Sequence, residues 1–120
     1  RTVWGDEPTI IVVEPEAAPA RVESIRAGAL VTTDGPVSEM GRLDCKTPSM
    51  IALAGLSRDA DLFVTISEDD AAKTVSKLAQ HGLSSTPSGV AGIAALTSGA
   101  VQLGPEDRVL AILSEGPEDV

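Results

Sequence analysis

Aromatic side chains are nearly absent from this chain of 120 residues, which has one Trp, one Phe and no Tyr. Its core must therefore be aliphatic, which favours stacked helices and parallel strands over an aromatic-rich β-sandwich. Cys45 is the only cysteine, so no disulfide can form within the chain. No stretch is long or apolar enough for a transmembrane span or a secretory signal. We therefore expect a cytoplasmic protein.

Positive charge is also scarce, because 9 basic residues face 18 acidic ones and the formal net charge is −9. A surface of this sign disfavours nucleic acid and anionic membranes, and we expect neither as a partner. The single histidine, His81, lies far along the chain from Cys45 and has no metal-like spacing to acidic residues. We therefore expect no metal site there, and we interpret His81 as a helix-end residue.

Short apolar runs alternate with helical patterns along the chain. Buried strands are expected at 9–13, 62–66 and 108–113, with a minor strand at 29–31. Helices are expected at about 17–28, 47–56, 67–82 and 86–97. This order predicts a single α/β domain over 1–120, three-layered, with a mostly parallel sheet flanked by helices. We expect the helix that begins at Thr47 and Pro48 to be largely buried.

Three polar stretches follow apolar segments: GRLDCKTPS (41–49), STPSG (85–89) and LSEG (113–116). The carboxyl ends of parallel strands meet at one edge of a sheet, where ligands collect. The sequence therefore predicts a ligand site built from these stretches.

Each candidate residue in these stretches also has an ordinary structural interpretation. The Ser114 hydroxyl can bond a ligand ring, or it is a turn serine. Ser88 and Gly89 can offer backbone N–H groups to an anion, or they cap and pack a helix. Asp44 can hold a polar group of a substrate, or it stabilises a turn. Lys46, beside Asp44, lacks the desolvated pocket that a reactive lysine needs.

Five stretches taken in order resemble fold-type II pyridoxal-phosphate enzymes, and the resemblance covers nearly the whole chain. They are VVEPEAAPA (12–20), MGRLDCKTPS (40–49), LFVTISEDDAAKTVSKLAQHGL (62–83), STPSGVAG (85–92) and VLAILSEGPEDV (109–120). The VEPE and Ser-Glu-Gly stretches look most like diaminopropionate ammonia-lyases. GRLDC and LSEG also look like stretches of the tryptophan synthase β subunit. The resemblance implies a lyase that performs α,β-elimination on a small amino acid.

The resemblance also implies a role for each candidate residue. Ser114 matches the residue that hydrogen-bonds the pyridine nitrogen of pyridoxal 5′-phosphate. Ser88 and Gly89 match the segment that flanks the cofactor ring, although Thr86 stands where an acidic residue is common. Asp44 matches a residue that contacts the substrate side chain, although the neighbouring Cys45 and Lys46 depart from that pattern.

Glu14 bears on metal binding, and two family motifs that this sequence lacks bear on catalysis. Glu14 matches a cation-ligating glutamate of serine racemases, but the nearby aspartate of that site is Ala20 here, so we expect no metal. The family's Schiff-base lysine and glycine-rich phosphate loop precede the VEP stretch and have no equivalent in this sequence. The resemblance therefore implies a carboxyl-terminal portion that holds no catalytic residue and is inactive alone. Its expected partners are an amino-acid substrate, an N-terminal part of the same enzyme and a second copy in a homodimer.

The alternative from another class is a noncatalytic α/β module that regulates or binds a small molecule. Such a module should fold completely and leave no apolar face exposed, whereas part of a larger enzyme should leave an apolar patch. The exposure of large apolar side chains therefore discriminates the two hypotheses.

Overall fold

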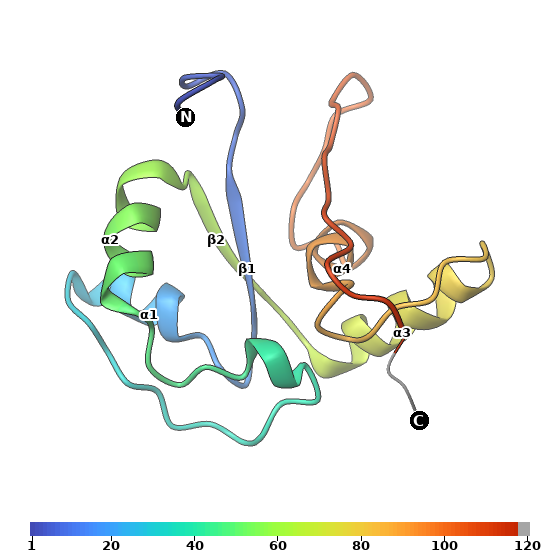
Figure 1. The fold of residues 1–120 in the computed structure, drawn as a ribbon, viewed down its shortest axis with the longest axis horizontal. Coiled ribbons are helices and arrows are strands. Elements are labelled where there is room, and N and C mark those ends of the chain that lie inside the picture. Colours follow the sequence, from blue (N-terminus) through green and yellow to red (C-terminus); the bar gives the residue numbers. More distant parts are fainter. Residues whose placement is uncertain (118–120) are drawn as a thin grey trace.

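The computed structural model describes residues 1–117, and Figure 1 shows their arrangement. The elements are β1 (Ile11–Pro15), α1 (Ala20–Ala27), the 3-10 turn η1 (Gly41–Leu43), α2 (Met50–Asp59), β2 (Leu62–Ile66), α3 (Glu68–Ala79) and α4 (Ala91–Thr97). β1 and β2 pair in parallel, with Ile11 opposite Leu62 and Pro15 opposite Ile66. The predicted α/β class with a parallel sheet is confirmed.

Helices α1 and α4 each contact both strands, and they lie to either side of the sheet (Figure 1). The core beside α4 contains six buried residues: Met40, Ile66, Ala71, Ala91, Ala94 and Ala95. Three of these are alanines of α4, and such small side chains let the helix backbone approach the sheet closely. The core is aliphatic, as the composition predicts.

Strand β2 has the bounds predicted for it, but β1 begins two residues later than the sequence pattern indicates. The Ile10 N–H donates to the Asp61 carboxylate at 2.7 Å, so this N–H group takes no part in the β1–β2 ladder. At its other end β1 continues through Glu14 and Pro15, which pair with β2 residues. Its first three residues are half-buried, so complete burial of this strand was a wrong prediction.

Helix α3 confirms its predicted start and end. Ser67 caps it by accepting a hydrogen bond from the Asp70 N–H at 3.0 Å. At the other end, the Leu83 N–H donates to the Leu78 carbonyl across Gly82, which has a φ of +77°. Only glycine adopts this left-handed conformation without strain. His81 lies at this helix end as expected, with its Nδ1 2.9 Å from the Lys77 carbonyl oxygen.

Helix α2 differs from the prediction in its start and in its burial. Its cap is Ser49, whose hydroxyl accepts from the Ala52 N–H at 3.3 Å. The Thr47 hydroxyl instead bonds that of Thr32 at 2.9 Å. Ile51 is 88% exposed and no residue of α2 is buried, so burial of this helix was a wrong prediction.

The predicted third strand, 108–113, and the minor strand, 29–31, are absent from the part of the chain that the structure describes. Segment 108–113 runs in the same direction as β1 in Figure 1 but joins no ladder. Leu110 is 82% and Ile112 is 74% exposed. The apolar pattern is that of a buried strand, but a strand needs a hydrogen-bonded neighbour, and β1 and β2 pair only with each other.

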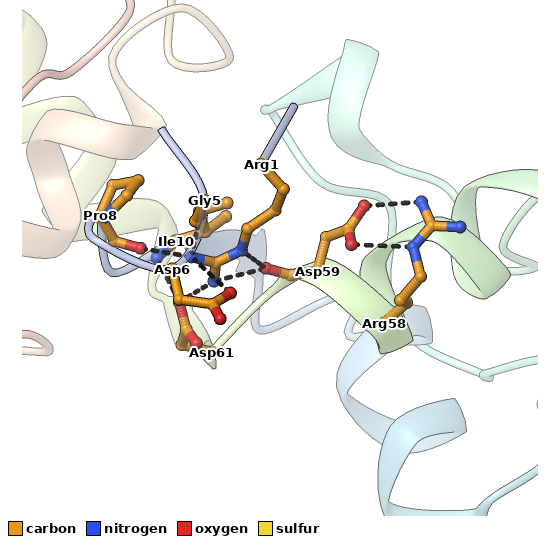
Figure 2. A network of polar contacts seen from close by, with 8 residues as sticks. All are labelled: Arg1, Gly5, Asp6, Pro8, Ile10, Arg58, Asp59 and Asp61. Atoms are coloured by element: carbon orange, nitrogen blue, oxygen red, sulfur yellow. Dashed lines mark hydrogen bonds and ion pairs between the residues drawn. The ribbon is translucent and has the colours of Figure 1, made fainter. Parts of the chain in front are cut away.

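The amino ends of β1 and β2 are tied together by Arg1 (Figure 2). Its guanidinium donates to the Asp59 carbonyl at 2.8 and 3.1 Å, to the Pro8 carbonyl at 2.8 Å and to the Asp61 carboxylate at 2.6 Å. Trp4, in the turn that Arg1 closes with Gly5, is 62% exposed. This network lies at the amino ends of the two strands, which is the end of the sheet opposite the three polar stretches.

Within residues 1–117, no helix has the length and apolar character needed to cross a lipid bilayer.

Candidate functional site

The structure joins the three polar stretches through one carboxylate, that of Glu115. Arg42 Nε lies 2.8 Å from Glu115 Oε1, and the Thr86 hydroxyl donates to Oε2. The Ser85 hydroxyl donates to the Glu115 main-chain carbonyl at 2.7 Å. We call Arg42, Ser85, Thr86 and Glu115 the Glu115 cluster. It places residues from all three stretches in contact, as the sequence predicts.

The turn 85–89 is packed tightly against the segment that contains Glu115. Within this turn the Gly89 N–H donates to Thr86 Oγ1 at 3.0 Å. The Arg42 N–H donates to the Ser88 hydroxyl at 3.2 Å, which links the turn to η1. A Cβ on Gly89 would lie 3.2 Å from Glu115 Cβ and still closer to Ser85 Oγ. At Gly89 the backbone of the turn 85–89 therefore approaches the backbone at Glu115 closely.

Of the predicted cofactor-binding residues, Ser88 and Gly89 are buried and Ser114 is exposed. Ser114 directly precedes Glu115. Within residues 1–117 the Glu115 carboxylate bonds Thr86 and Arg42, whereas the Ser114 hydroxyl makes no hydrogen bond. Helix α4 begins at Ala91, later than predicted, because residues 87–90 form a turn that Thr86 caps. The structure thus brings Ser88 and Gly89 together with the segment that carries Ser114.

Asp44 lies apart from the Glu115 cluster, although it follows Arg42 by two residues. Its carboxylate accepts from Lys46 Nζ at 2.5 Å. The hydrogen bond from Lys46 lowers the pKa of Asp44 below its ordinary value, so the carboxylate is ionised at neutral pH. An ionised carboxylate at this position can accept hydrogen bonds or pair with a cationic group of a ligand.

Glu14 is buried at the carboxyl end of β1, with 2% exposure. Its carboxylate accepts from the Arg21 N–H at 2.9 Å and from the Val22 N–H at 3.4 Å. Arg21 also places a guanidinium nitrogen 3.4 Å away. Desolvation raises the pKa of Glu14 above its ordinary value, with these partners opposing the rise. Glu14 thus bonds the first turn of α1 rather than facing a ligand.

An open hollow of about 390 Å³ lies between α1 and β2, lined in part by Val22, Arg26 and Phe63. None of Asp44, Ser88, Gly89 and Ser114 lines it. The hollow is therefore separate from the site that the three polar stretches form.

Truncating the carboxylate at the centre of the cluster should weaken the folded state. We expect Glu115→Ala to lower the free energy of unfolding by about 1.5 kcal/mol, because hydrogen bonds to a charged group are lost. Urea unfolding of the intact protein measures this. Glu106→Ala, which removes an exposed carboxylate of the same charge, should change stability by less than about 0.5 kcal/mol. Equal losses in the two variants would show that the cluster contributes nothing.

The sequence pattern indicates the three stretches but gives no prediction for Arg42 and Glu115, the charged pair that joins them. A signal is present, because residues of opposite charge stand within two candidate loops. Pairing them requires knowing that the two loops meet, which is a property of the fold.

The parallel β1–α–β2 arrangement, with polar loops gathered at one edge, is the architecture of ligand-binding α/β enzymes. The profile of the family described as "Pyridoxal-phosphate dependent enzyme" matches residues 2–115. The chain belongs to this pyridoxal-phosphate-dependent, fold-type II family, as the resemblance implied.

Solved structures share this fold. A threonine deaminase of T.th. matches with a TM-score of 0.86 and 22% identity over 99% of this chain. An L-serine ammonia-lyase of Rhizomucor miehei matches with 0.77 and 23% over 90%, and maize serine racemase with 0.68 and 18% over 72%. The chain spans 42%, 36% and 26% of the lengths of these proteins, respectively. A search of curated proteins finds no significant match.

The residues at this site are compatible with a planar heteroaromatic cofactor. Ser114 offers an exposed hydroxyl in the residue that directly precedes Glu115, and Glu115 is joined to the turn 85–89. A hydroxyl can both donate and accept a hydrogen bond, and it therefore suits a ring nitrogen in either protonation state.

Proposed function

We propose that the chain is part of an ammonia-lyase that performs α,β-elimination on a small amino acid, similar to diaminopropionate ammonia-lyase. In this proposal Ser114 bonds the pyridine nitrogen of the cofactor, Ser88 and Gly89 flank its ring, and Asp44 contacts the substrate. The observation that supports it most is the Glu115 cluster, because it connects Ser114 and the turn 85–89 at one edge of the sheet.

The proposal assigns each group a limited task. Pyridoxal phosphate, when bound, withdraws electrons from the α-carbon of an amino acid and so favours loss of a proton and of a β-substituent. The neutral Ser114 hydroxyl orients the ring without forcing protonation of its nitrogen, as a carboxylate would. The ionised Asp44 carboxylate binds and orients a polar group of the substrate.

The lysines of this chain do not fit the task of holding the cofactor covalently. Lys46 uses its ammonium on three oxygens of the chain. Lys73 is exposed on α3 and pairs with Asp69 at 2.5 Å, and Lys77 is exposed on the same helix. We therefore propose that the lysine and the phosphate loop come from a protein segment outside these 120 residues, and that the chain alone is inactive.

The exposed apolar side chains favour this proposal over the noncatalytic module. Leu110, Ile112 and Ile51 are each more than two-thirds exposed, at 82%, 74% and 88%. A self-contained module should cover such groups. Segment 108–113 in particular has the sequence of a buried strand, and it would be covered if a further strand paired with it.

Replacing Ser114 with aspartate in the intact enzyme tests the assignment. We expect Ser114→Asp to change the absorption spectrum of the bound cofactor and to lower the elimination rate by about tenfold, because a carboxylate would hold the ring nitrogen protonated. Ser114→Thr keeps the hydroxyl and should retain the spectrum. An unchanged spectrum and turnover in Ser114→Asp would contradict the contact with the ring nitrogen.

A further inference from the structure

Lys46 is held in a manner unusual for a loop lysine. Its ammonium donates to the Ala17 carbonyl at 2.9 Å, to the Pro36 carbonyl at 2.7 Å and to Asp44 Oδ1 at 2.5 Å. An ammonium group has three N–H donors and no acceptor. The three oxygens therefore satisfy it completely, and its side chain is only 28% exposed.

The three oxygens come from separate segments. Ala17 lies in the turn between β1 and α1, Pro36 in the loop 29–40, and Asp44 after η1. The backbone of Lys46 adds a further link, because its carbonyl accepts from the Thr33 N–H at 2.8 Å. The ammonium thus performs the task of a bound cation that gathers oxygen ligands from distant parts of the chain.

Asp44 lies in the chain between Arg42 and Lys46, and each of these residues is bonded to a distant segment. On one side, Arg42 pairs with Glu115 and donates through its backbone to Ser88. On the other side, Lys46 fixes the end of the loop to the turn at Ala17. The carboxylate of Asp44 is itself one of the three oxygens, so its orientation depends directly on the Lys46 ammonium.

We propose that Lys46 is an internal cation that occupies an oxygen-lined site formed by Ala17, Pro36 and Asp44, and that it is the positioning residue for Asp44. The second half rests on the proposed role of Asp44 in substrate binding. The first half is independent of the cofactor and of the reaction.

Removing the side chain should convert this site into one for a small cation from solution. We expect Lys46→Ala to lower the unfolding temperature of the intact protein by about 4 °C, a shift that methylammonium chloride largely restores. Tetramethylammonium chloride, which cannot donate a hydrogen bond, should restore nothing. The measurement is thermal unfolding against the concentration of each salt.

Two control variants distinguish a site from a general effect of salt or charge. Lys46→Met removes the charge but fills the space, so it should be destabilised without responding to methylammonium. Lys73→Ala removes an exposed lysine that is also paired to a carboxylate, and it should behave as the parent does in both salts. If Lys46→Ala responds no more to methylammonium than these controls do, the proposed cation site is wrong.

The positioning of Asp44 is tested by steady-state kinetics of the same enzyme. We expect Lys46→Ala to raise KM for the amino acid by roughly tenfold with a much smaller change in kcat, and methylammonium to reverse the rise. A stability response without any change in KM would overturn the positioning role. The Ser114→Asp spectrum, which does not involve Lys46, separately reports a failure of the proposed function.

Discussion

Replacing Gly35 with alanine should lower the free energy of unfolding by about 3 kcal/mol, because two backbone segments cross with no room for a side chain. A Cβ on Gly35 would lie 3.1 Å from the carbonyl carbon of Ala17 and still nearer to its oxygen. Both are backbone atoms and cannot rotate away. The same oxygen accepts from Lys46, so relieving the clash would also disturb that bond.

Urea unfolding of the intact protein measures this loss, and Gly55→Ala is the matched control. Gly55 lies within α2, where an added Cβ meets no atom within 4 Å. Alanine is the better helix former, so Gly55→Ala should stabilise the protein by about 0.5 to 1 kcal/mol. Equal stability of Gly35→Ala and the parent would mean that the two segments do not cross as the structure shows.

Truncation of Glu14 is expected to cost about 3 kcal/mol, because its buried carboxylate is a hydrogen-bond partner of the first turn of α1. Glu14→Ala leaves the N–H groups of Arg21 and Val22 without this partner and opens a void. Glu16→Ala, two residues along and exposed, should change stability by less than about 0.5 kcal/mol. Similar unfolding midpoints for the two variants would contradict the capping role of Glu14.

The pH dependence of stability gives a second measurement at Glu14. Its pKa is raised in the folded protein, so the folded state binds a proton more tightly than the unfolded chain does. Its contribution to stability is therefore full below the ordinary value of 4.5 and falls as the pH rises through the folded pKa. Relative to Glu14→Gln, which has no such group, the parent should be more stable at about pH 4 than at about pH 7. A difference that does not vary with pH would contradict the raised pKa.

Local signals in the sequence predicted much of the fold. Strand β2 and helix α3 were predicted closely because their limits depend on nearby residues, such as the Ser67 cap and Gly82. The start of α2 was misplaced because Thr47 and Ser49 are both good caps. The choice between them depends on the distant Thr32, which bonds Thr47.

Burial was harder to predict than secondary structure. The apolar pattern of 108–113 is that of a buried strand, but burial requires a neighbour that no local pattern supplies. Glu14 shows the converse, because a glutamate at a strand end gives no sign that it will be buried. In the candidate site, the grouping of the three polar stretches was predicted from the expected sheet. The charged pair Arg42–Glu115 and the contacts of Lys46 required the structure.

Trp4 lies in the amino-terminal turn that Arg1 closes with Gly5. Ser114 instead follows segment 108–113, which runs in the same direction as β1 (Figure 1). Trp4 is the only tryptophan of the chain, which has no tyrosine. Intrinsic fluorescence from this chain therefore originates from one exposed turn and reports on the Arg1 network rather than on the core. With Ser114 in its proposed role, tryptophan emission and cofactor absorbance would report on two different parts of the fold.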